Sequence, residues 1–280
     1  MNDTNRKLTP LAVFFIVVLP TSAVVEALII AKGIGVLYAV LMWLPALAAL
    51  AANLWKVKQS GEKCGFLKFF RQGGFRRCGV KYILLGILLP FVYLLVPYLV
   101  YWKLCPDNFA YSGVAFSVIL KDLAPMTIIG IFTGLLTATG EEIGWRGFMV
   151  PELFKKCGLN KTLLFSGLIW CGWHLPLLIF GDYMAGTPLW YQVPAFVLCI
   201  FPVGVMAGLL ALKTGSLWPA AFLHAAHNNF DQAVFGVITR GDDMMYYVSE
   251  TGLLTIACAW ALAAVMYLTM KRKIKLCKPL

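Results

Sequence analysis

The sequence predicts an all-α, polytopic membrane protein with about eight transmembrane helices around a polar intramembrane cavity. The chain has 280 residues, of which 60% are hydrophobic and only 13% charged, outside the range of soluble domains. Its apolar runs have the length of a membrane-crossing helix, and helices or closed barrels are the structures that satisfy their backbone within lipid. Ionisable residues inside these runs then predict a polar cavity, because such residues are costly in hydrocarbon.

Eight apolar runs follow one another along the chain, separated by short polar connections. No internal repeat and no soluble segment interrupts them, so we expect residues 1–280 to form a single integral-membrane domain. The fourth run extends to residue 149 if its helix continues through a pair of carboxylates. The expected spans are 11–31, 34–55, 79–102, 114–138, 162–180, 189–212, 217–238 and 251–270.

Basic residues divide unevenly between the two sides that these spans define. With both termini cytoplasmic, the cytoplasmic segments hold all but four of the 24 Lys and Arg residues, the others being Lys32, Lys103, Lys121 and Arg240. Cytoplasmic loops carry an excess of Lys and Arg. The pattern predicts a multi-pass protein of the cell membrane with both termini in the cytoplasm and the lipid bilayer as its surroundings. The net charge of +11 belongs to these connections, so we expect no nucleic-acid partner.

Two adjacent carboxylates, Glu141 and Glu142, follow the uncharged run 126–138. Glu142 and Arg146 are one helical turn apart on the same face and can pair. Glu141 points about 100° away and is free for another role. A solvated helix end would also explain an isolated Glu-Glu pair, so the weight of this motif depends on its partners elsewhere in the chain.

The three histidines of the chain all lie in apolar segments downstream of the carboxylates. His174 belongs to the fifth expected span, and His224 and His227 to the seventh. His224 and Asn228 are four residues apart and share a helix face. Each of them alone is equally well explained by interhelical hydrogen bonds, worth about 0.6 kcal/mol each in membranes. Together these side chains need partners inside the protein, which favours one shared polar cavity.

These residue types suit hydrolysis of an amide bond within the membrane. A carboxylate in a low-dielectric site can act as base and acid near neutral pH. Glu141 is the candidate that takes a proton from water, and His174 would orient the same water. His224 and Asn228 together could donate hydrogen bonds to the oxyanion that forms when water attacks a carbonyl.

A metal site is the alternative for the same residues. Glu141, His174 and His224 would supply three ligands and leave a fourth position open, as in catalytic zinc sites. The signature of two histidines four apart with a glutamate after the first is absent, and the eight cysteines are scattered without a close pair. We therefore expect no cofactor, with zinc as the open alternative.

Three motifs in this order resemble the CPBP family of CAAX proteases and bacteriocin-processing enzymes, also called Abi, which includes the type II CAAX prenyl proteases. They are Glu141-Glu142-x-x-x-Arg146, Trp170-x-x-x-His174 and His224-x-x-x-Asn228, within a core of residues 127–230. The resemblance implies an intramembrane endopeptidase that uses glutamate-activated water on a protein or peptide substrate, prenylated in the CAAX case.

By motif position, Glu141 and His174 correspond to the water-activating pair, and His224 and Asn228 to the oxyanion-stabilising pair. Glu142 and Arg146 complete the first motif in a supporting role. Trp170 is a departure, because the family usually has phenylalanine there. Since both are large aromatics, we expect an effect on packing or substrate fit and none on the chemistry. The polar residue His227 lies outside the motifs, and we interpret it as supporting or structural.

Two rival functions remain at this stage. A non-catalytic binding or bacteriocin-immunity protein would keep the cavity without the chemistry, although no motif residue is lost. A transporter would show two similar halves, which the sequence lacks. For Glu141 to meet both histidines, the fourth helix must continue past Gly140 or the spans must kink, with Gly140, Gly172 and Pro176 as candidates. We expect the resulting cavity to open toward the cytoplasm.

Overall fold

The computed structural model describes residues 8–61 and 73–274, and within these ranges the chain forms helices joined by short connections. One isolated β-bridge pairs Phe109 with Thr239. The all-α prediction is confirmed.

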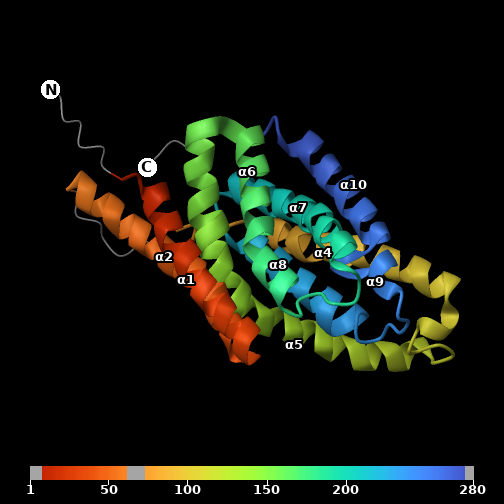
Figure 1. The fold of residues 1–280 in the computed structure, drawn as a ribbon. Coiled ribbons are helices and arrows are strands. Elements are labelled where there is room, and N and C mark those ends of the chain that lie inside the picture. The colour runs from red at the N-terminus through yellow and green to blue at the C-terminus, as the bar shows by residue number, and fades with distance from the viewer. Residues whose placement is uncertain (1–7, 62–72, 275–280) are drawn as a thin grey trace.

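The first two helices form an antiparallel pair at one side of the molecule (Figure 1). Helix α1 spans Pro10–Lys32 and α2 spans Val36–Ser60. The hydroxyl of Thr9 caps α1 by accepting a hydrogen bond from the Ala12 N–H at 3.2 Å. Gly33 ends the helix in the left-handed region, at φ 62°, where glycine carries no steric penalty.

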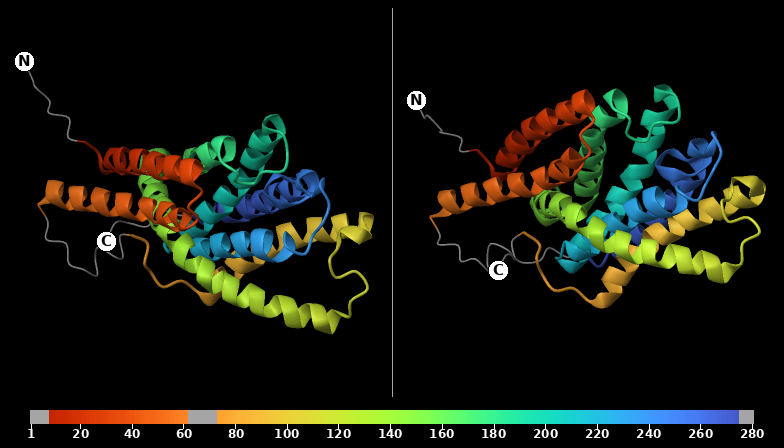
Figure 2. Two further views of the ribbon diagram at one scale, coloured as in Figure 1. Left: turned by 60° about the horizontal axis from the view of Figure 1, so that its bottom comes forward. Right: turned by 90° about the horizontal axis from the view of Figure 1, so that it is seen from below.

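Helix α4, Val80–Leu104, leads through the short 3₁₀ turn η1, Pro106–Asn108, to α5, Phe116–Glu142. The connection is fixed to the far end of the chain, because Ala110 N–H donates to the Ile238 carbonyl and Arg240 N–H to the Asn108 carbonyl. Figure 2 shows this connection far from the start of α1.

Helix α5 continues without a break past the carboxylate pair at its end, Glu141 and Glu142. The π-helix η2, Ile143–Met149, joins α5 directly to α6, Val150–Phe180. The chain reverses at Gly158, whose φ of 71° and ψ of −179° separate the two arms of α6. The fourth helix therefore does continue past Gly140, as one of our two expectations required, but the sharp break lies at Gly158 and not at the glycines that we expected.

The remaining helices complete the bundle around α7, Leu189–Thr214, which is the most buried of the candidate membrane spans. Helix α8, Trp218–Asn228, passes into the π-helix η3, Asn229–Phe235. The short turns α9, Met244–Tyr247, and η4, Ser249–Thr251, precede the last helix, α10, Leu253–Met270.

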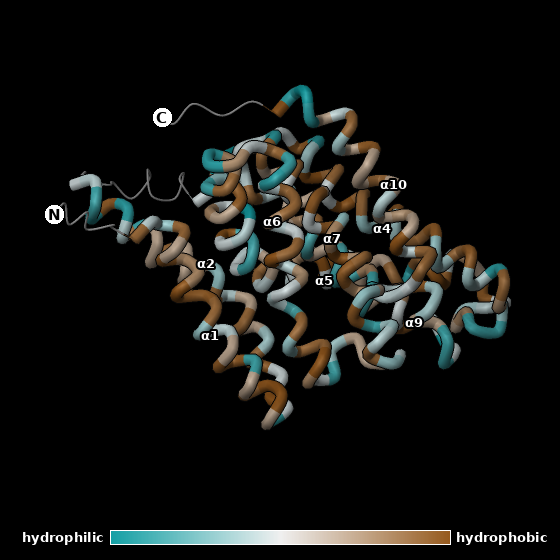
Figure 3. The backbone as a smooth tube through the Cα atoms, turned by 45° about the horizontal axis from the view of Figure 1, so that its top comes forward, coloured by the Kyte–Doolittle hydropathy of each residue, from teal (hydrophilic) through white to brown (hydrophobic). Residues whose placement is uncertain are grey.

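The helices have the surface of a polytopic membrane protein. Hydrophobic side chains are exposed on α5, among them Ile129, Phe132 and Leu136. Figure 3 shows hydrophobic residues along the helices and hydrophilic ones mainly at their ends and connections. Six helical stretches of the described residues are long and apolar enough to cross a membrane by length and composition alone.

This count differs from the eight expected spans for two reasons. Residues 116–180 count as one stretch, but the chain reverses within them at Gly158, so their two arms correspond to the fourth and fifth expected spans. The seventh, 217–238, is divided into the 11-residue α8 and the 7-residue η3, so no single regular helix fills it.

Contacts between connections define two ends of the molecule. At the first, which we name the basic end, Trp55 donates to the Leu8 carbonyl, Lys56 pairs with Glu152 at 3.3 Å, and Tyr267 donates to Asn160. At the other, which we name the acidic end, Tyr101 donates to Asp243, Tyr191 to the Thr251 carbonyl and Tyr183 to Glu250. The basic end comprises residues 8–9, 55–61, 73–79, 150–161, 213–217 and 271–274, and the acidic end residues 32–35, 103–122, 181–188 and 236–252.

Candidate active site

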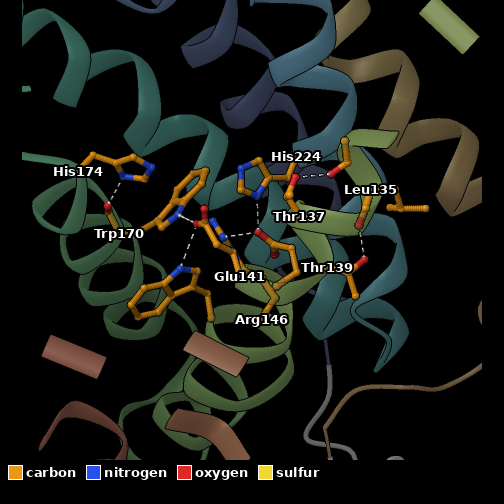
Figure 4. Close-up of polar contacts among 11 residues, drawn as sticks. Leu135, Thr137, Thr139, Glu141, Arg146, Trp170, His174 and His224 are labelled. Atoms are coloured by element: carbon orange, nitrogen blue, oxygen red, sulfur yellow. Dashed lines mark hydrogen bonds and ion pairs between the residues drawn. The ribbon is translucent and has the colours of Figure 1, made fainter. Parts of the chain in front are cut away.

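Glu141 is buried at the end of α5 and is held there by two indole groups (Figure 4). Trp170 Nε1–H donates to Glu141 Oε2 at 3.0 Å, and Trp145 Nε1–H donates to the same oxygen at 3.3 Å. Trp145 is one helical turn after Glu141, whereas Trp170 comes from α6. Both hydrogen bonds that Glu141 accepts from described residues thus end on a single carboxylate oxygen.

Glu142 points in another direction and carries the ion pair that the spacing predicted. Its Oε1 accepts from Arg146 at 2.7 Å and from His224 Nδ1 at 3.0 Å. All three side chains are buried. The guanidinium of Arg146 also lies over the ring of Trp170, 4.1 Å from its centroid. A buried carboxylate without such cationic and hydrogen-bonding partners would cost several kcal/mol, on the order of 3–5.

His174 stands one turn after Trp170 on α6 and is oriented by the backbone. Its Nδ1 lies 2.7 Å from the Trp170 carbonyl oxygen, which can only accept, so Nδ1 carries the hydrogen and donates it. The neutral ring then has Nε2 available as an acceptor. Aromatic rings enclose it, with Trp173 at 5.1 Å and Tyr183 stacked at 6.2 Å between centroids.

Part of this arrangement lines one cavity of about 340 Å³, a volume suited to a small part of a peptide chain. All four predicted catalytic residues, Glu141, His174, His224 and Asn228, contribute to its wall. They come from α5, α6 and α8, and the α2 side of the wall is apolar. The other lining residues are Tyr38, Leu41, Met42, Trp170, Trp173, Leu177, Tyr183, Ile200, His227, Gln232 and Glu250.

A second polar group in the same wall was missed in the sequence. His227 Nδ1 is 2.7 Å from the Tyr93 hydroxyl, and its Nε2 is 3.0 Å from Glu250 Oε1. The other oxygen of Glu250 accepts from the Tyr183 hydroxyl at 3.1 Å. Glu250 falls between the expected spans 217–238 and 251–270, and no motif links it to the other residues of the site. In the sequence, the residue that pointed to this group was His227, the histidine outside the motifs. Its supporting role remains a prediction.

The turn that carries Glu250 is built into the core. Ser249, Glu250 and Thr251 are all buried, and Ser249 adopts a φ of 67°, which is uncommon for a residue other than glycine. Its hydroxyl donates to Asp231 at 2.8 Å, and this bond holds the strained conformation. Burial would raise the pKa of Glu250, but the hydrogen bond from His227 and the nearby imidazoles outweigh it and lower that pKa.

The predicted metal ligands do not converge on one point. Within residues 8–61 and 73–274, no three His, Cys, Asp or Glu side chains are arranged to hold a metal ion. The spacing of the side chains, and not their hydrogen bonds, differs from a ligand set, because a metal-bound histidine commonly donates its other ring N–H to a carboxylate, as His224 does to Glu142. The reaction proposed below therefore uses no metal ion.

Comparison with known proteins agrees with the arrangement of the motifs. Residues 123–230 match the family described as type II CAAX prenyl endopeptidase Rce1-like. The CAAX prenyl protease 2 of Methanococcus maripaludis is 28% identical over 184 residues, which cover 61% of this chain and 63% of that protein. Over this region the chain is similar to the CAAX protease family.

The matched region contains every residue of the three motifs, from Glu141 to Asn228. The alignment spans less than two thirds of the archaeal relative, so the activity and the substrate of that protein come to this chain as proposals. Tyr93, Tyr38 and Glu250 line or support the cavity but lie outside the family match.

Proposed function

We propose that this chain is an integral-membrane endopeptidase that hydrolyses a peptide bond with a water molecule activated by Glu141. The observation that supports it best is that Glu141, His174, His224 and Asn228 line a single cavity although they come from three helices. The family match points to the same chemistry, because its description is that of a prenyl endopeptidase.

In the first step, water bound between Glu141 and His174 attacks the carbonyl carbon of the substrate. Its proton passes to the Glu141 carboxylate, and the carbonyl oxygen becomes an oxyanion. Because both indoles donate to Oε2 of Glu141, its Oε1 is the oxygen that accepts this proton. His174 Nε2, an acceptor in the tautomer fixed by the Trp170 carbonyl, accepts the other hydrogen of the water in a hydrogen bond.

His224 and Asn228 stabilise the oxyanion in this proposal. The Nδ1–H of His224 donates to the Glu142 carboxylate, so Nε2 becomes a second donor when the ring is an imidazolium. A neighbouring carboxylate favours that charged form. In the second step the tetrahedral intermediate collapses, the C–N bond breaks, and the proton on Glu141 passes to the leaving amine.

The substrate class follows from the surroundings of the cavity and from the relative. Leu41, Leu177 and Ile200 give the cavity an apolar side, which suits a peptide carrying hydrophobic side chains or a lipid group. The archaeal relative is named a CAAX prenyl protease. We propose a CAAX-type or other membrane-associated peptide, with prenylation as a property to be tested.

Purified full-length protein in liposomes should cleave either a farnesylated CAAX peptide or a member of a panel of transmembrane peptides. Glu141→Ala should lower kcat by about 10²–10⁴-fold, the usual contribution of a general base. His224→Ala should lower it by about 10²–10³-fold, as for loss of an oxyanion donor.

Each protein should be assayed with and without a strong chelator. Activity that survives the chelator but not Glu141→Ala supports the glutamate mechanism. Inhibition by chelator that added zinc reverses would support the metal alternative. If wild type cuts no peptide, or if the variants cut equally well, a non-catalytic binding or immunity protein becomes the better description.

A further inference from the structure

We propose that Gln232 is a substrate-binding residue, whose side-chain amide forms hydrogen bonds with the main chain of the peptide about two residues from the scissile carbonyl. The inference rests on the proposed function, because it adds a contact to the same site. It joins three observations: the place of Gln232 in the cavity wall, the atoms of its amide that are free to bind, and its distance from the proposed oxyanion site.

Gln232 continues the row of motif residues on the helix that carries them. Helix α8 passes directly into η3, so the helical path runs on beyond the last motif residue. His224, Asn228 and Gln232 follow one another at intervals of four residues, about one turn each, and all three line the cavity. His224 is buried, Asn228 is half-buried and Gln232 is exposed. The row therefore leads from the buried part of the cavity to its opening.

The amide of Gln232 is oriented by the carboxylate of Glu250. Its Nε2 lies 3.5 Å from Glu250 Oε1, and because a carboxylate only accepts hydrogen bonds, the nitrogen and not the oxygen of the amide faces it. Glu250 is also bound by His227 at 3.0 Å and by the Tyr183 hydroxyl at 3.1 Å. These two shorter bonds already satisfy both carboxylate oxygens, so the burial of Glu250 does not require Gln232.

Two groups of this amide remain free to bind a ligand. Within residues 8–61 and 73–274, the Oε1 of Gln232 accepts no hydrogen bond and its second N–H donates none. Each residue of a peptide main chain offers one N–H donor and one carbonyl acceptor, which are the partners that a carboxamide can bind as a pair. An anionic group at this point would be repelled by the nearby charge of Glu250. The arrangement therefore suits a neutral main chain.

Helix geometry sets the distance from the scissile bond. Gln232 lies ~6 Å beyond Asn228 along the helix, at 1.5 Å per residue, whereas an extended peptide advances ~3.3 Å per residue. In the proposed mechanism the scissile carbonyl oxygen is bound by His224 and Asn228. The amide of Gln232 then reaches main-chain groups about two residues from that carbonyl.

Peptide binding to protein that cannot cut tests the contact without catalysis. The protein is full-length Glu141→Ala in detergent, and the probe is whichever fluorescently labelled peptide of the panel above binds it most tightly, measured by fluorescence anisotropy. Adding Gln232→Ala should weaken binding about threefold to tenfold, as for loss of neutral hydrogen bonds. Gln59→Ala is the matched control, because Gln59 is an exposed glutamine that donates to the Leu8 carbonyl at 2.9 Å, outside the cavity. It should leave binding unchanged.

Methylation of single main-chain nitrogens in a cleavable peptide tests which group Gln232 binds. A methyl two residues before or two residues after the scissile bond should, at one of these positions, raise KM about threefold to tenfold with kcat nearly unchanged, since the contact is the same in the ground and transition states. In Gln232→Ala protein the same methyl should cause no further rise.

The outcomes separate this proposal from the proposed function. Equal peptide affinity with and without Gln232→Ala, or a methyl effect that persists in full in that variant, overturns the role of Gln232 even if wild type cuts the peptide. If wild type cuts nothing but Gln232→Ala still weakens binding, the peptidase function fails and the contact stands. If no peptide of the panel binds, both are rejected.

Discussion

The proposed chemistry depends on the carboxylate of Glu141. The shorter of the two hydrogen bonds that it accepts comes from Trp170. Hydrogen bonds to a charged acceptor contribute about 1.5–3 kcal/mol each. The indole of Trp170 donates one at 3.0 Å, and the face of the same ring lies against Arg146. One side chain therefore connects the proposed general base with the buried ion pair beside it.

Replacing this indole by a benzyl ring should separate hydrogen bonding from packing. Trp170→Phe introduces the residue that the family usually has and keeps an aromatic face for Arg146. Loss of the N–H donor leaves Glu141 with Trp145, whose bond is longer at 3.3 Å. We expect kcat to fall about tenfold, the equivalent of 1.4 kcal/mol, with little change in KM. Steady-state kinetics on the peptide that wild type cuts would measure both.

The control is the same substitution at a buried tryptophan outside the cavity. Trp102 donates its indole N–H to Thr239 at 3.0 Å, so Trp102→Phe loses a comparable bond and comparable volume. It should lower thermal stability without a tenfold loss of kcat. If both variants lose activity alike, the effect of Trp170→Phe is structural and the role of its N–H is rejected.

Sequence patterns predicted the residues of this site better than their contacts. The four-residue spacing of Glu142 and Arg146 predicted their ion pair, because helix geometry alone fixes which side chains meet. Trp170 was expected to affect packing, yet its N–H reaches the carboxylate of Glu141. That contact joins residues 29 positions apart on two helices, and no local pattern encodes it.

At the scale of elements, the π-helix η2 determines where the carboxylates lie, and close packing against α2 holds it in place. A Cβ on Gly144 would come within 2.6 Å of the Pro45 carbonyl oxygen, closer than real atoms approach. Pro45 belongs to the interior of α2 and cannot move aside as a flexible side chain would. Gly144 is therefore required for η2 and α2 to pack, independently of any need for unusual dihedrals.

Gly144→Ala should separate η2 from α2 and displace Glu141 and Glu142. We expect a loss of stability of about 1–3 kcal/mol, typical of overpacking, together with a large loss of activity. Gly172→Ala is the matched control, because a Cβ there meets nothing within 4 Å although the residue stands two positions from His174. It should be neutral or stabilising by up to about 1 kcal/mol, since alanine favours helix. Thermal unfolding in detergent measures both.

The connection between α6 and α7 is a second element that positions the site. Tyr183 stacks on His174, donates its hydroxyl to Glu250, and accepts at its carbonyl from Gln192 at 3.0 Å. Tyr183→Phe removes the hydroxyl and keeps the ring. The ring that stacks on His174 would then lose its hydrogen bond to Glu250, so the orientation of His174 would be less restricted. We expect kcat to fall about threefold to tenfold, which corresponds to the loss of a hydrogen bond worth about 0.5–1.5 kcal/mol, with KM nearly unchanged.

Tyr191→Phe is the control for this prediction. Tyr191 also ties α7 to the η4 region, donating toward the Tyr246 and Thr251 carbonyls, but it does not line the cavity. Its loss should reduce stability by a similar amount and leave kcat within about twofold. An equal loss of kcat in both variants would show that general loosening of the acidic end, and not the contact with His174, explains the result.

Hydropathy located the helices but not their irregular turns. The expected spans overlap α1, α2, α4, α5, α6, α7 and α10, because long apolar runs mark them directly. Neither π-helix was predicted, since an i→i+5 turn differs from an α-turn in its hydrogen bonds and not in residue composition. The reversal at Gly158 falls between the fourth and fifth expected spans, where the sequence predicts a connection.

At the scale of the whole molecule, the connections beside the cavity are acidic. Asp182, Asp242 and Asp243 lie in the two connections that carry Tyr183 and Glu250, and residues 181–188 and 241–252 contain no Lys or Arg. Exposed charges of one sign around a cleft concentrate ligands of the opposite sign, and salt screens the effect over about 8 Å at physiological ionic strength.

If the proposed peptidase activity holds, kcat/KM should therefore depend on the charge of the peptide outside its scissile bond. Two peptides that differ by one residue, lysine or glutamate, should be cut at rates that differ about threefold to tenfold in favour of lysine at low salt, and less at 0.5 M salt.

The variant Asp182→Asn/Asp242→Asn removes two exposed charges and should shrink the difference without changing kcat for either peptide. Lys58→Gln/Lys156→Gln, at the basic end, should leave the ratio unchanged, because those charges lie at the other end of the bundle. A preference for the glutamate peptide, or equal ratios in both double variants, would mean that substrate does not pass the acidic end on its way to Glu141.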